Sequence, residues 1–151
     1  MVAQKIIHVR DAKPQDLRPV YEIAQDSFKD PYPLRLIRHI HSTNPEGFLI
    51  AEIGGSIVGY LIGVVRWGNV GHILAIAVDK SHRRKGVGTA LMINALERLR
   101  KHGASQIKLE VRASNEGAQK FYERLGFESQ EVVPSYYSDG EAAISVKYKF
   151  D

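Results

Sequence analysis

The sequence predicts a single α/β (α+β) domain, residues 1–151, in which helices flank a sheet. Short apolar, β-branched runs alternate with segments whose apolar residues recur at helical spacing. Two adjacent glycines, Gly54 and Gly55, join two of these runs as a hairpin. A basic turn with two glycines, at 83–88, joins another run to a long helical segment. A chain of 151 residues has the length of one ordinary domain.

The N-terminal part of the chain is expected to form one strand and two helices. The strand covers Ile6 to Arg10, and Pro14 fits the first turn of the following helix because no helical hydrogen bond is lost there. Two prolines at 31 and 33 end this helix, since proline disfavours helical geometry in the residue before it. The apolar face of the first helix is predicted to be Leu17, Val20, Tyr21, Ala24 and Phe28, and that of the second Leu34, Ile37 and Ile40.

The middle of the chain is expected to supply three strands and the longest helix. Phe48 to Ile53 and Ile57 to Trp67 read as the two strands of the hairpin, and Gly71 to Val78 as the next strand. A helix runs from Gly86 to about His102 and stops at Gly103. Its apolar stripe is Leu91, Met92, Ala95, Leu96 and Leu99.

The C-terminal part is expected to hold three strands and one helix. Ile107 to Val111 is a strand, and a helix opens at 114–116 and ends before Gly126. Phe127 to Val133 and Ile144 to Phe150 are the last two strands, and the latter alternates apolar and polar residues as a half-buried strand does. The apolar face of the helix is Ala118, Phe121, Tyr122 and Leu125.

The basic turn between strand and helix is typical of a phosphate-binding site. Glycines leave room for an anion near the backbone, and the amides of a helix's first turn have no partner within the helix. The spacing is Arg-x-x-Gly-x-Gly, which excludes a Walker loop and a Rossmann turn. We therefore expect this turn to hold a pyrophosphate, with an ordinary solvated turn as the alternative. Its residues are Arg83, Arg84, Lys85, Gly86, Val87, Gly88 and Thr89.

Composition limits the function classes further. The net charge of +4 could suit nucleic acid, but the densest basic run, Lys80 to Lys85, lies at the phosphate turn, so nucleic acid is disfavoured as a partner. The absence of Cys excludes disulfides, thiolate metal sites and an acyl-Cys intermediate. The dispersed His residues predict no metal site. Residues 1–6 lack an apolar signal segment and no apolar run approaches roughly 18 residues, so we expect a cytoplasmic protein without a membrane partner.

A second block of residues, from Leu109-Glu110-Val111 through Asn115 and Tyr122 to Phe127, follows the basic turn. Together the two blocks resemble the conserved motifs of the GNAT acetyltransferase superfamily, in the same order. The wider run from Gly71 to Phe150, with Tyr136-Tyr137-Ser138-Asp139-Gly140-Glu141, resembles the protein N-terminal acetyltransferases of the RimI type and the NatA catalytic subunit. The resemblance is looser from Ile6 to Trp67. It implies a GNAT fold, with a mixed and mostly antiparallel sheet flanked by helices.

The resemblance also implies an activity, which is transfer of acetyl from acetyl-CoA to the α-amine of proteins by direct attack. Substrates would be protein or peptide N-termini, and a ribosome or auxiliary subunit is left open as a partner. The cofactor arm would lie along the backbone of Ile76, Ala77 and Val78, with its pyrophosphate at Arg83 to Thr89. Lysine Nε- or small-amine acetylation is the alternative activity, and an acyl-CoA-sensing or nucleic-acid-binding module is the alternative outside catalysis.

Four side chains take catalytic or cofactor roles by the same resemblance. Glu110 matches the general base of the RimI type, and His72 is the second candidate base. Tyr122 matches the acid that protonates the departing thiolate, beside the cofactor, and Asn115 matches a contact to the cofactor arm. Each has a structural alternative: a solvated strand residue for Glu110, a strand-start histidine for His72, a core aromatic for Tyr122 and a helix cap for Asn115.

The substrate side is implied by two further segments. Tyr136 and Tyr137 match a loop whose tyrosine hydroxyls hold the backbone of the first peptide residues, and the alternative is a pair that covers the sheet end. Asp30 and Tyr32 lie where relatives have a Leu-Pro-Glu-Asn-Tyr-Pro type segment, and Asp30 stands in for the Glu. Ala142 replaces a common Asp. The preference among Ala, Ser, Thr and Met termini therefore stays open.

The chemistry of the acceptor favours an N-terminal amine. Only a neutral amine attacks the thioester carbonyl, so a base must accept its proton. An α-amine has a pKa of about 7.7 to 8.0 against about 10.4 for lysine, so neutralising lysine at neutral pH costs roughly 3 to 4 kcal/mol more. A modest base such as Glu110 therefore suits an α-amine.

Overall fold

Seven strands form one open, mixed sheet in the computed structural model, which describes residues 6–151. The strand order is β1-β2-β3-β4-β5-β7-β6, and of the six pairings in this part of the chain only β4–β5 is parallel. The strands are β1 (His8–Asp11), β2 (Phe48–Ile53), β3 (Ser56–Arg66), β4 (Val70–Val78), β5 (Gln106–Arg112), β6 (Glu128–Val133) and β7 (Ala143–Lys149). The predicted sheet is confirmed, while residues 1–5, on which the expectation of no signal segment rests, lie outside the described residues.

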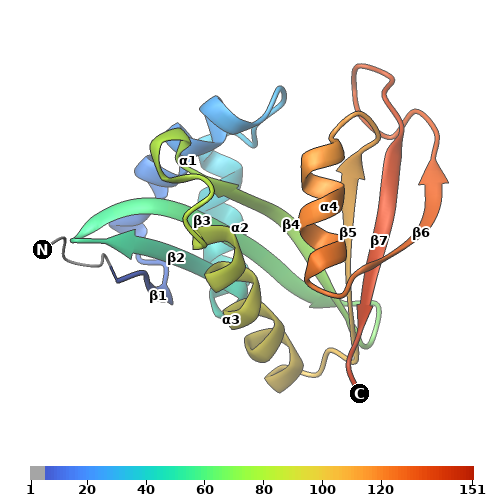
Figure 1. The fold of residues 1–151 in the computed structure, drawn as a ribbon. Coiled ribbons are helices and arrows are strands. Elements are labelled where there is room, and N and C mark those ends of the chain that lie inside the picture. Colours follow the sequence, from blue (N-terminus) through green and yellow to red (C-terminus); the bar gives the residue numbers. More distant parts are fainter. Residues whose placement is uncertain (1–5) are drawn as a thin grey trace, which may run out of the picture.

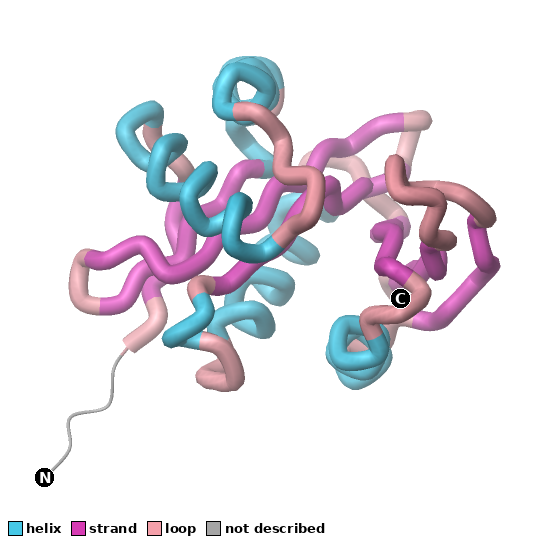
Figure 2. Tube along the Cα trace, turned by 90° about the horizontal axis from the view of Figure 1, so that it is seen from above, coloured by secondary structure: helices cyan, strands magenta, loops and turns pink. Residues whose placement is uncertain are grey.

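Four α-helices cover the two faces of the sheet (Figures 1 and 2). They are α1 (Leu17–Ser27), α2 (Leu34–Thr43), α3 (Val87–Lys101) and α4 (Glu116–Arg124). Helices α1 and α2 pack on one face around Val20, Ile37 and Tyr60, and α3 and α4 pack on the other around Leu91 and Tyr122. No helix in the described part of the chain is long and apolar enough to cross a bilayer.

The N-terminal elements differ in detail from the sequence-based expectation. Strand β1 begins at His8 rather than Ile6, and it pairs with β2 as far as Asp11. Phe28 was expected on the buried face of α1 but is 39% exposed, because the chain leaves the helix there in an extended conformation. Ile23 is buried in the helix instead, at 9% exposure. The helix therefore ends one residue before the position that the apolar pattern had included.

The hairpin and the stop of α3 form as predicted. Gly54 and Gly55 have φ angles of 57° and 83°, the left-handed region that a two-residue hairpin turn requires at both positions. Gly103 has a φ of 104° directly after the last turn of α3. Glycine is favoured at these three positions because a side chain would be strained there.

Strands β4 and β5 are paired only at their first residues. Val70 to His72 pair with Gln106 to Lys108, and beyond this point β4 leans away from β5 (Figure 1). The register of β3 with β4 shifts at the same place, where Ile62 and Gly63 pair with Ala75 and Ile73 and leave Leu74 as an extra residue. Within the described residues, the backbone of β4 from Ile73 to Val78 thus has no strand partner on the side of β5. We call the point of separation the β4–β5 fork.

The buried stripe of α3 provides a test of how this helix packs on the sheet. Leu91 is fully buried against the sheet, whereas Ile93 on the same helix is 56% exposed. Replacing Leu91 by Ala removes buried methyl groups and leaves a cavity, so we expect a loss of about 2 to 5 kcal/mol in the free energy of unfolding. The matched change Ile93→Ala should alter it by about 0.5 kcal/mol or less. Urea denaturation of both variants measures the difference, and equal losses would contradict the assigned orientation of α3.

Candidate active site

A cavity of about 190 Å³ lies at the β4–β5 fork. Its walls come from the end of β3, from β4 and β5, from the loop between α1 and α2, and from the loop between β6 and β7. The lining residues are Tyr32, Arg66, His72, Ile73, Leu74, Glu110, Tyr136 and Tyr137. The parallel pairing places the ends of several elements here, so polar side chains distant in sequence converge on one small space.

His72 and Glu110 form a buried pair across the fork. His72 pairs with Lys108 in the sheet, and Glu110 follows two residues later on the same face of β5. The Nε2 atom of His72 lies 2.7 Å from Oε1 of Glu110. His72 is 5% exposed and the Glu110 side chain 8% exposed. The solvated-strand alternative for Glu110 is therefore wrong, because both side chains are withdrawn from water.

Opposing influences set the charge of Glu110. Burial is the largest and raises the pKa of the carboxyl group, because a carboxylate loses hydration. The hydrogen bond from His72 and the Lys108 ammonium, whose Nζ lies 3.4 Å from Oε2, act in the opposite direction. Together they hold the pKa of Glu110 below its ordinary value. Glu110 is therefore a carboxylate at neutral pH, as a proton acceptor must be.

Three tyrosines surround this carboxylate. The hydroxyl of Tyr136 donates a hydrogen bond to Glu110 Oε1 at 3.3 Å, and its ring meets the ring of Tyr137 edge-on at 5.0 Å. Burial, reinforced by the Glu110 carboxylate, raises the pKa of Tyr136 to about 12. Burial also raises the pKa of Tyr137 and of Tyr32. All three hydroxyls stay protonated at neutral pH and can donate hydrogen bonds to a ligand.

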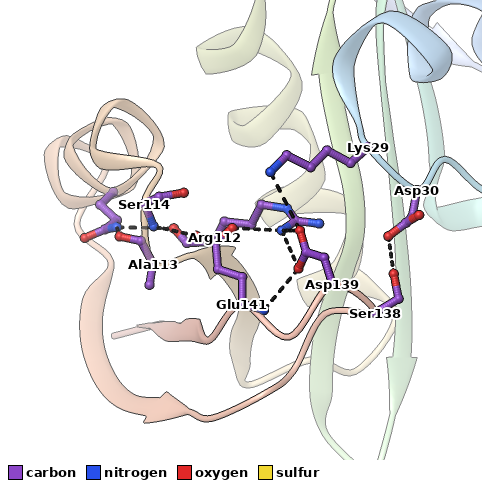
Figure 3. A network of polar contacts seen from close by, with 9 residues as sticks. Lys29, Asp30, Arg112, Ala113, Ser114, Ser138, Asp139 and Glu141 are labelled. Carbon is purple, nitrogen blue, oxygen red and sulfur yellow. Dashed lines mark hydrogen bonds and ion pairs between the residues drawn. The ribbon is translucent and has the colours of Figure 1, made fainter.

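Ion pairs and hydrogen bonds fix the loop between β6 and β7 (Figure 3). Arg112 Nη1 donates to Asp139 Oδ2 at 2.9 Å and to Glu141 Oε1 at 2.8 Å. The other oxygen of Glu141 accepts from the backbone amide of Ser114 at 2.8 Å. These hydrogen bonds, with the one from Ser114 first, lower the pKa of Glu141 to about 2. The loop that carries Tyr136 and Tyr137 is thus tied to the end of β5.

The same loop is joined to the opposite wall of the cavity. Asp30 accepts a hydrogen bond from the Ser138 hydroxyl, and Lys29 Nζ lies 3.7 Å from Asp139 Oδ2 (Figure 3). Lys29 and Asp30 belong to the loop between α1 and α2, which also contributes Tyr32 to the cavity. Asp30 therefore connects the two loops and is not itself among the lining residues.

The basic turn precedes α3 as the sequence predicts. Gly86 has a φ of 86° at the start of the helix, and its carbonyl accepts from Ala90 at 3.0 Å. A Cβ atom on Gly88 would lie 3.2 Å from Phe121 Cζ, so glycine allows α3 and α4 to pack closely. Arg83 Nε donates to the carbonyl of Val78 at 3.1 Å, so this side chain is directed to the end of β4. The first-turn amides of α3 can donate hydrogen bonds to an anion.

Asn115 precedes α4 as its N-cap, and Tyr122 lies within the helix. The Oδ1 atom of Asn115 accepts from the amide of Ala118 at 3.0 Å, so it caps the helix. Tyr122 is 6% exposed and packs between the rings of Phe121 and Phe127. Burial raises its pKa. The structure thus shows the capping and packing contacts that the sequence allowed, while the cofactor and acid roles stay predictions, and neither residue lines the cavity.

Comparison with known proteins places the chain in a family. Residues 17–127 match the model of the acetyltransferase (GNAT) family. The chain belongs to the GNAT acetyltransferase family. It is 45% identical over 138 residues to an uncharacterized N-acetyltransferase of Methanocaldococcus jannaschii, covering 90% of this chain and 87% of that protein. It is 31% identical to an N-alpha-acetyltransferase of Sulfurisphaera tokodaii, covering 92% and 90%.

A solved structure supports the same family. The crystal structure of Ard1 from Thermoplasma volcanium is 36% identical in sequence and superposes with a TM-score of 0.91, covering 96% of this chain and 98% of that one. The GNAT fold expected from the motifs is therefore confirmed. Among residues 6–151, no group of three His, Asp or Glu side chains could hold a metal ion.

The sequence-predicted residues of this GNAT chain fall into two groups in space. His72, Glu110, Tyr32, Tyr136 and Tyr137 meet at the cavity. The predicted cofactor residues follow the unpaired part of β4, the start of α3 and the face of α4, where they do not meet the cavity as lining residues. They are Ile76, Ala77, Val78, Arg83, Arg84, Lys85, Gly86, Val87, Gly88, Thr89, Asn115 and Tyr122.

Two charged residues at the cavity were not predicted. Arg66 lines it from the end of β3, and Lys108 lies beside Glu110 on β5. Both side chains face the ring of Trp67: the Arg66 guanidinium carbon lies 4.3 Å and the Lys108 Nζ atom 5.5 Å from the ring centroid. The sole tryptophan of the chain, next to an arginine at the end of a strand, is the signal that could have found Arg66.

The opposing effects on the pKa of Glu110 provide a test of the site. Replacing His72 by Phe removes the hydrogen bond that lowers the pKa of Glu110 and leaves the effect of burial less opposed. We expect the pKa of Glu110 to rise in this variant, which a ¹³C NMR titration of the carboxyl groups measures. Glu141, which does not contact His72, should keep its pKa of about 2 in the same titration. A Glu110 pKa that stays or falls would contradict the pairing.

Proposed function

We propose that this protein transfers acetyl from acetyl-CoA to the α-amine of protein N-termini. The observation that carries the proposal is the buried, ionised Glu110 within a tyrosine-lined cavity at the β4–β5 fork. A small cavity with one proton acceptor and several hydroxyl donors suits the end of a polypeptide chain. The N-alpha-acetyltransferase of S. tokodaii, similar along nearly its whole length, supports the same activity.

The residues along β4 and at the start of α3 fit an acetyl-CoA molecule. The backbone of Ile76 to Val78 lacks a strand partner on the side of β5, so its amides and carbonyls are free to pair with the amides of a pantetheine arm. Gly86, where a Cβ atom would meet only Ile7 at 4.0 Å, leaves the first-turn amides of α3 open to a pyrophosphate, beside the positive charges of Arg84 and Lys85. Acetyl-CoA supplies the acetyl thioester when it is bound there.

The chain's own groups can then move the two protons of the reaction. As the amine nitrogen forms its bond to the acetyl carbon and the carbon–sulfur bond breaks, the amine loses a proton and the sulfur gains one. Glu110 accepts the proton from the amine, directly or through water. The Tyr122 hydroxyl, which burial keeps protonated, supplies the proton to the sulfur. A backbone amide near Ile76 to Val78 stabilises the oxyanion between these steps.

The low pKa of Glu110 agrees with an α-amine acceptor. A carboxylate held below its ordinary pKa is a weak base, and it serves best when the amine already exists partly in its neutral form. An α-amine with a pKa of about 7.7 to 8.0 meets this condition at neutral pH, whereas a lysine amine does not. The hydroxyls of Tyr136 and Tyr137 would hold the backbone of the first residues, which a free terminus can bring into the cavity.

A peptide panel tests the acceptor. The purified protein is incubated with acetyl-CoA and peptides that begin with free Ala, Ser, Thr, Met or Glu, and with N-blocked peptides that carry an internal Lys. We expect acetyl only on the free α-amines, located by mass spectrometry, and the rates rank the first residues. Acetyl on internal lysine alone would show a lysine acetyltransferase. Binding of acetyl-CoA without transfer to any amine would favour an acyl-CoA sensor.

The proposed base is tested by Glu110→Gln. This change keeps the shape of the side chain but removes the proton acceptor, so the acetylation rate should fall by about 10²- to 10⁴-fold. Acetyl-CoA affinity, measured by calorimetry, should stay nearly the same because Glu110 is not among the residues proposed to hold the cofactor along Ile76 to Val78 and at the start of α3. The control is Glu97→Gln, an exposed carboxylate on α3 whose loss should leave the rate unchanged. A normal rate in Glu110→Gln would remove Glu110 from the mechanism.

A further inference from the structure

We propose that Arg66 is a positioning residue that holds His72 as a neutral ring with its proton on Nε2, so that Glu110 is left as the proton acceptor of the site. The inference deepens the proposed function and assigns separate roles to the two candidate bases. It rests on the hydrogen-bond partners of the two ring nitrogens of His72. Its first test reads those nitrogens directly and does not require activity.

Arg66 is held at the cavity from the end of β3. Its Nη2 atom donates to Nδ1 of His72, and its guanidinium carbon lies 4.3 Å from the centroid of the Trp67 ring. Trp67 in turn packs against His72, with ring centroids 5.2 Å apart. Among the described residues Arg66 forms no ion pair with a carboxylate. Within this part of the chain, its guanidinium group contacts the His72 imidazole and the Trp67 indole.

The partners of His72 determine which nitrogen carries the proton. A guanidinium has five N–H donors, no acceptor, and remains protonated in proteins. Nδ1 of His72 must therefore present its lone pair to Arg66, and in a neutral ring the proton then resides on Nε2. Nε2 lies 2.7 Å from Glu110 Oε1, where an N–H donor meets a carboxylate acceptor. One tautomer satisfies both hydrogen bonds.

The charged and titratable groups around the His72 ring come from two strands and two loops. Arg66 faces it from β3, Glu110 and Lys108 from β5, Tyr136 and Tyr137 from the loop before β7, and Tyr32 from the loop after α1. A proton added at Nδ1 would break the hydrogen bond from Arg66 and place two cations in contact. Glu110 favours a charged ring, but its carboxylate is already shared with Lys108 and Tyr136. Arg66 thus favours the neutral His72 ring over the charged one.

This arrangement leaves His72 without a free lone pair. Its Nδ1 lone pair is engaged by Arg66 and its Nε2 bears a proton, so it has no site that can accept a proton from the substrate amine. Glu110 still has Oε2 for that proton, because His72 and Tyr136 both donate to Oε1. His72 therefore orients the carboxylate, and Arg66 sets the state in which His72 can do so.

The first experiment reads the ring nitrogens of His72 by NMR. Long-range ¹H–¹⁵N spectra of the ¹⁵N-labelled protein distinguish protonated from unprotonated ring nitrogens, and His72→Phe identifies the signals of His72 by their loss. In the unaltered protein at pH 7.5 we expect Nε2 protonated and Nδ1 unprotonated. A proton on Nδ1, alone or together with Nε2, would overturn the proposal whether or not the protein acetylates peptides.

Variants of Arg66 show whether it causes that state. In Arg66→Met the Nδ1 lone pair is freed, so we expect a proton on Nδ1 in part of the population, in contrast to the unaltered protein. Arg66→Lys, which still offers only donors, should restore the Nε2–H tautomer at least in part. The control is Arg100→Met, since the Arg100 guanidinium also lies over an aromatic ring, that of Phe150, but forms no hydrogen bond to a histidine ring among the described residues. An unchanged His72 spectrum in a folded Arg66→Met would overturn the proposal.

The pH dependence of acetylation then separates positioning from packing. An imidazolium beside Glu110 weakens the base, so at pH 6 relative to pH 8 the kcat/KM of Arg66→Met should fall about tenfold more than that of the unaltered protein. In a His72→Phe background the same substitution should leave the pH profile unchanged, because no imidazole remains to be protonated. Equal pH shifts in both backgrounds would refute the inference even where the peptide panel confirms N-terminal acetylation.

Discussion

Three residue pairs between β4 and β5 hold the two parts of the sheet together, and the site depends on how early that pairing ends. Because the strands separate after His72, the far part of β4 keeps backbone groups free for a ligand. The same separation opens space between the loops at one end of the sheet. Glu110 lies two residues beyond the last pair, so the proton acceptor stands where the opening begins. A longer β4–β5 pairing would have occupied these backbone groups and closed the space between the loops.

Burying a carboxylate at this place requires several donors. Glu110 receives hydrogen bonds from His72 and Tyr136 and lies close to the Lys108 ammonium, which together outweigh its lost hydration. In the described residues no buried side-chain nitrogen or oxygen lacks a hydrogen-bond partner. The contacts of Glu110 with His72, Tyr136 and Lys108, and of His72 with Arg66, form one connected polar network. Within this network each donor also limits what its neighbour can do.

Local signals predicted most of the fold, and long-range pairing decided the remainder. Gly54-Gly55 and the stripe of α3 specify their structure within a few residues, so their predictions hold. Phe28 satisfied the helical period but follows the last turn of α1, and the nearest local stop signal, Pro31, lies three residues later. Glu110 and His72 were found separately through the resemblance, while their contact spans 38 positions and needs the parallel pairing. Arg66 belongs to no motif, and only the β3–β4 hairpin brings it to His72.

The contacts between the two loops have a consequence for how the cavity opens. Lys29–Asp139 is a largely exposed ion pair, of a kind that contributes little to stability and is weakened by salt. The walls that carry Tyr32 and Tyr136 are thus joined by exposed contacts, whereas the wall that carries Tyr136 is also tied to the end of β5 through Arg112. Rising ionic strength is therefore expected to weaken the contact between these two loops before it affects the buried core.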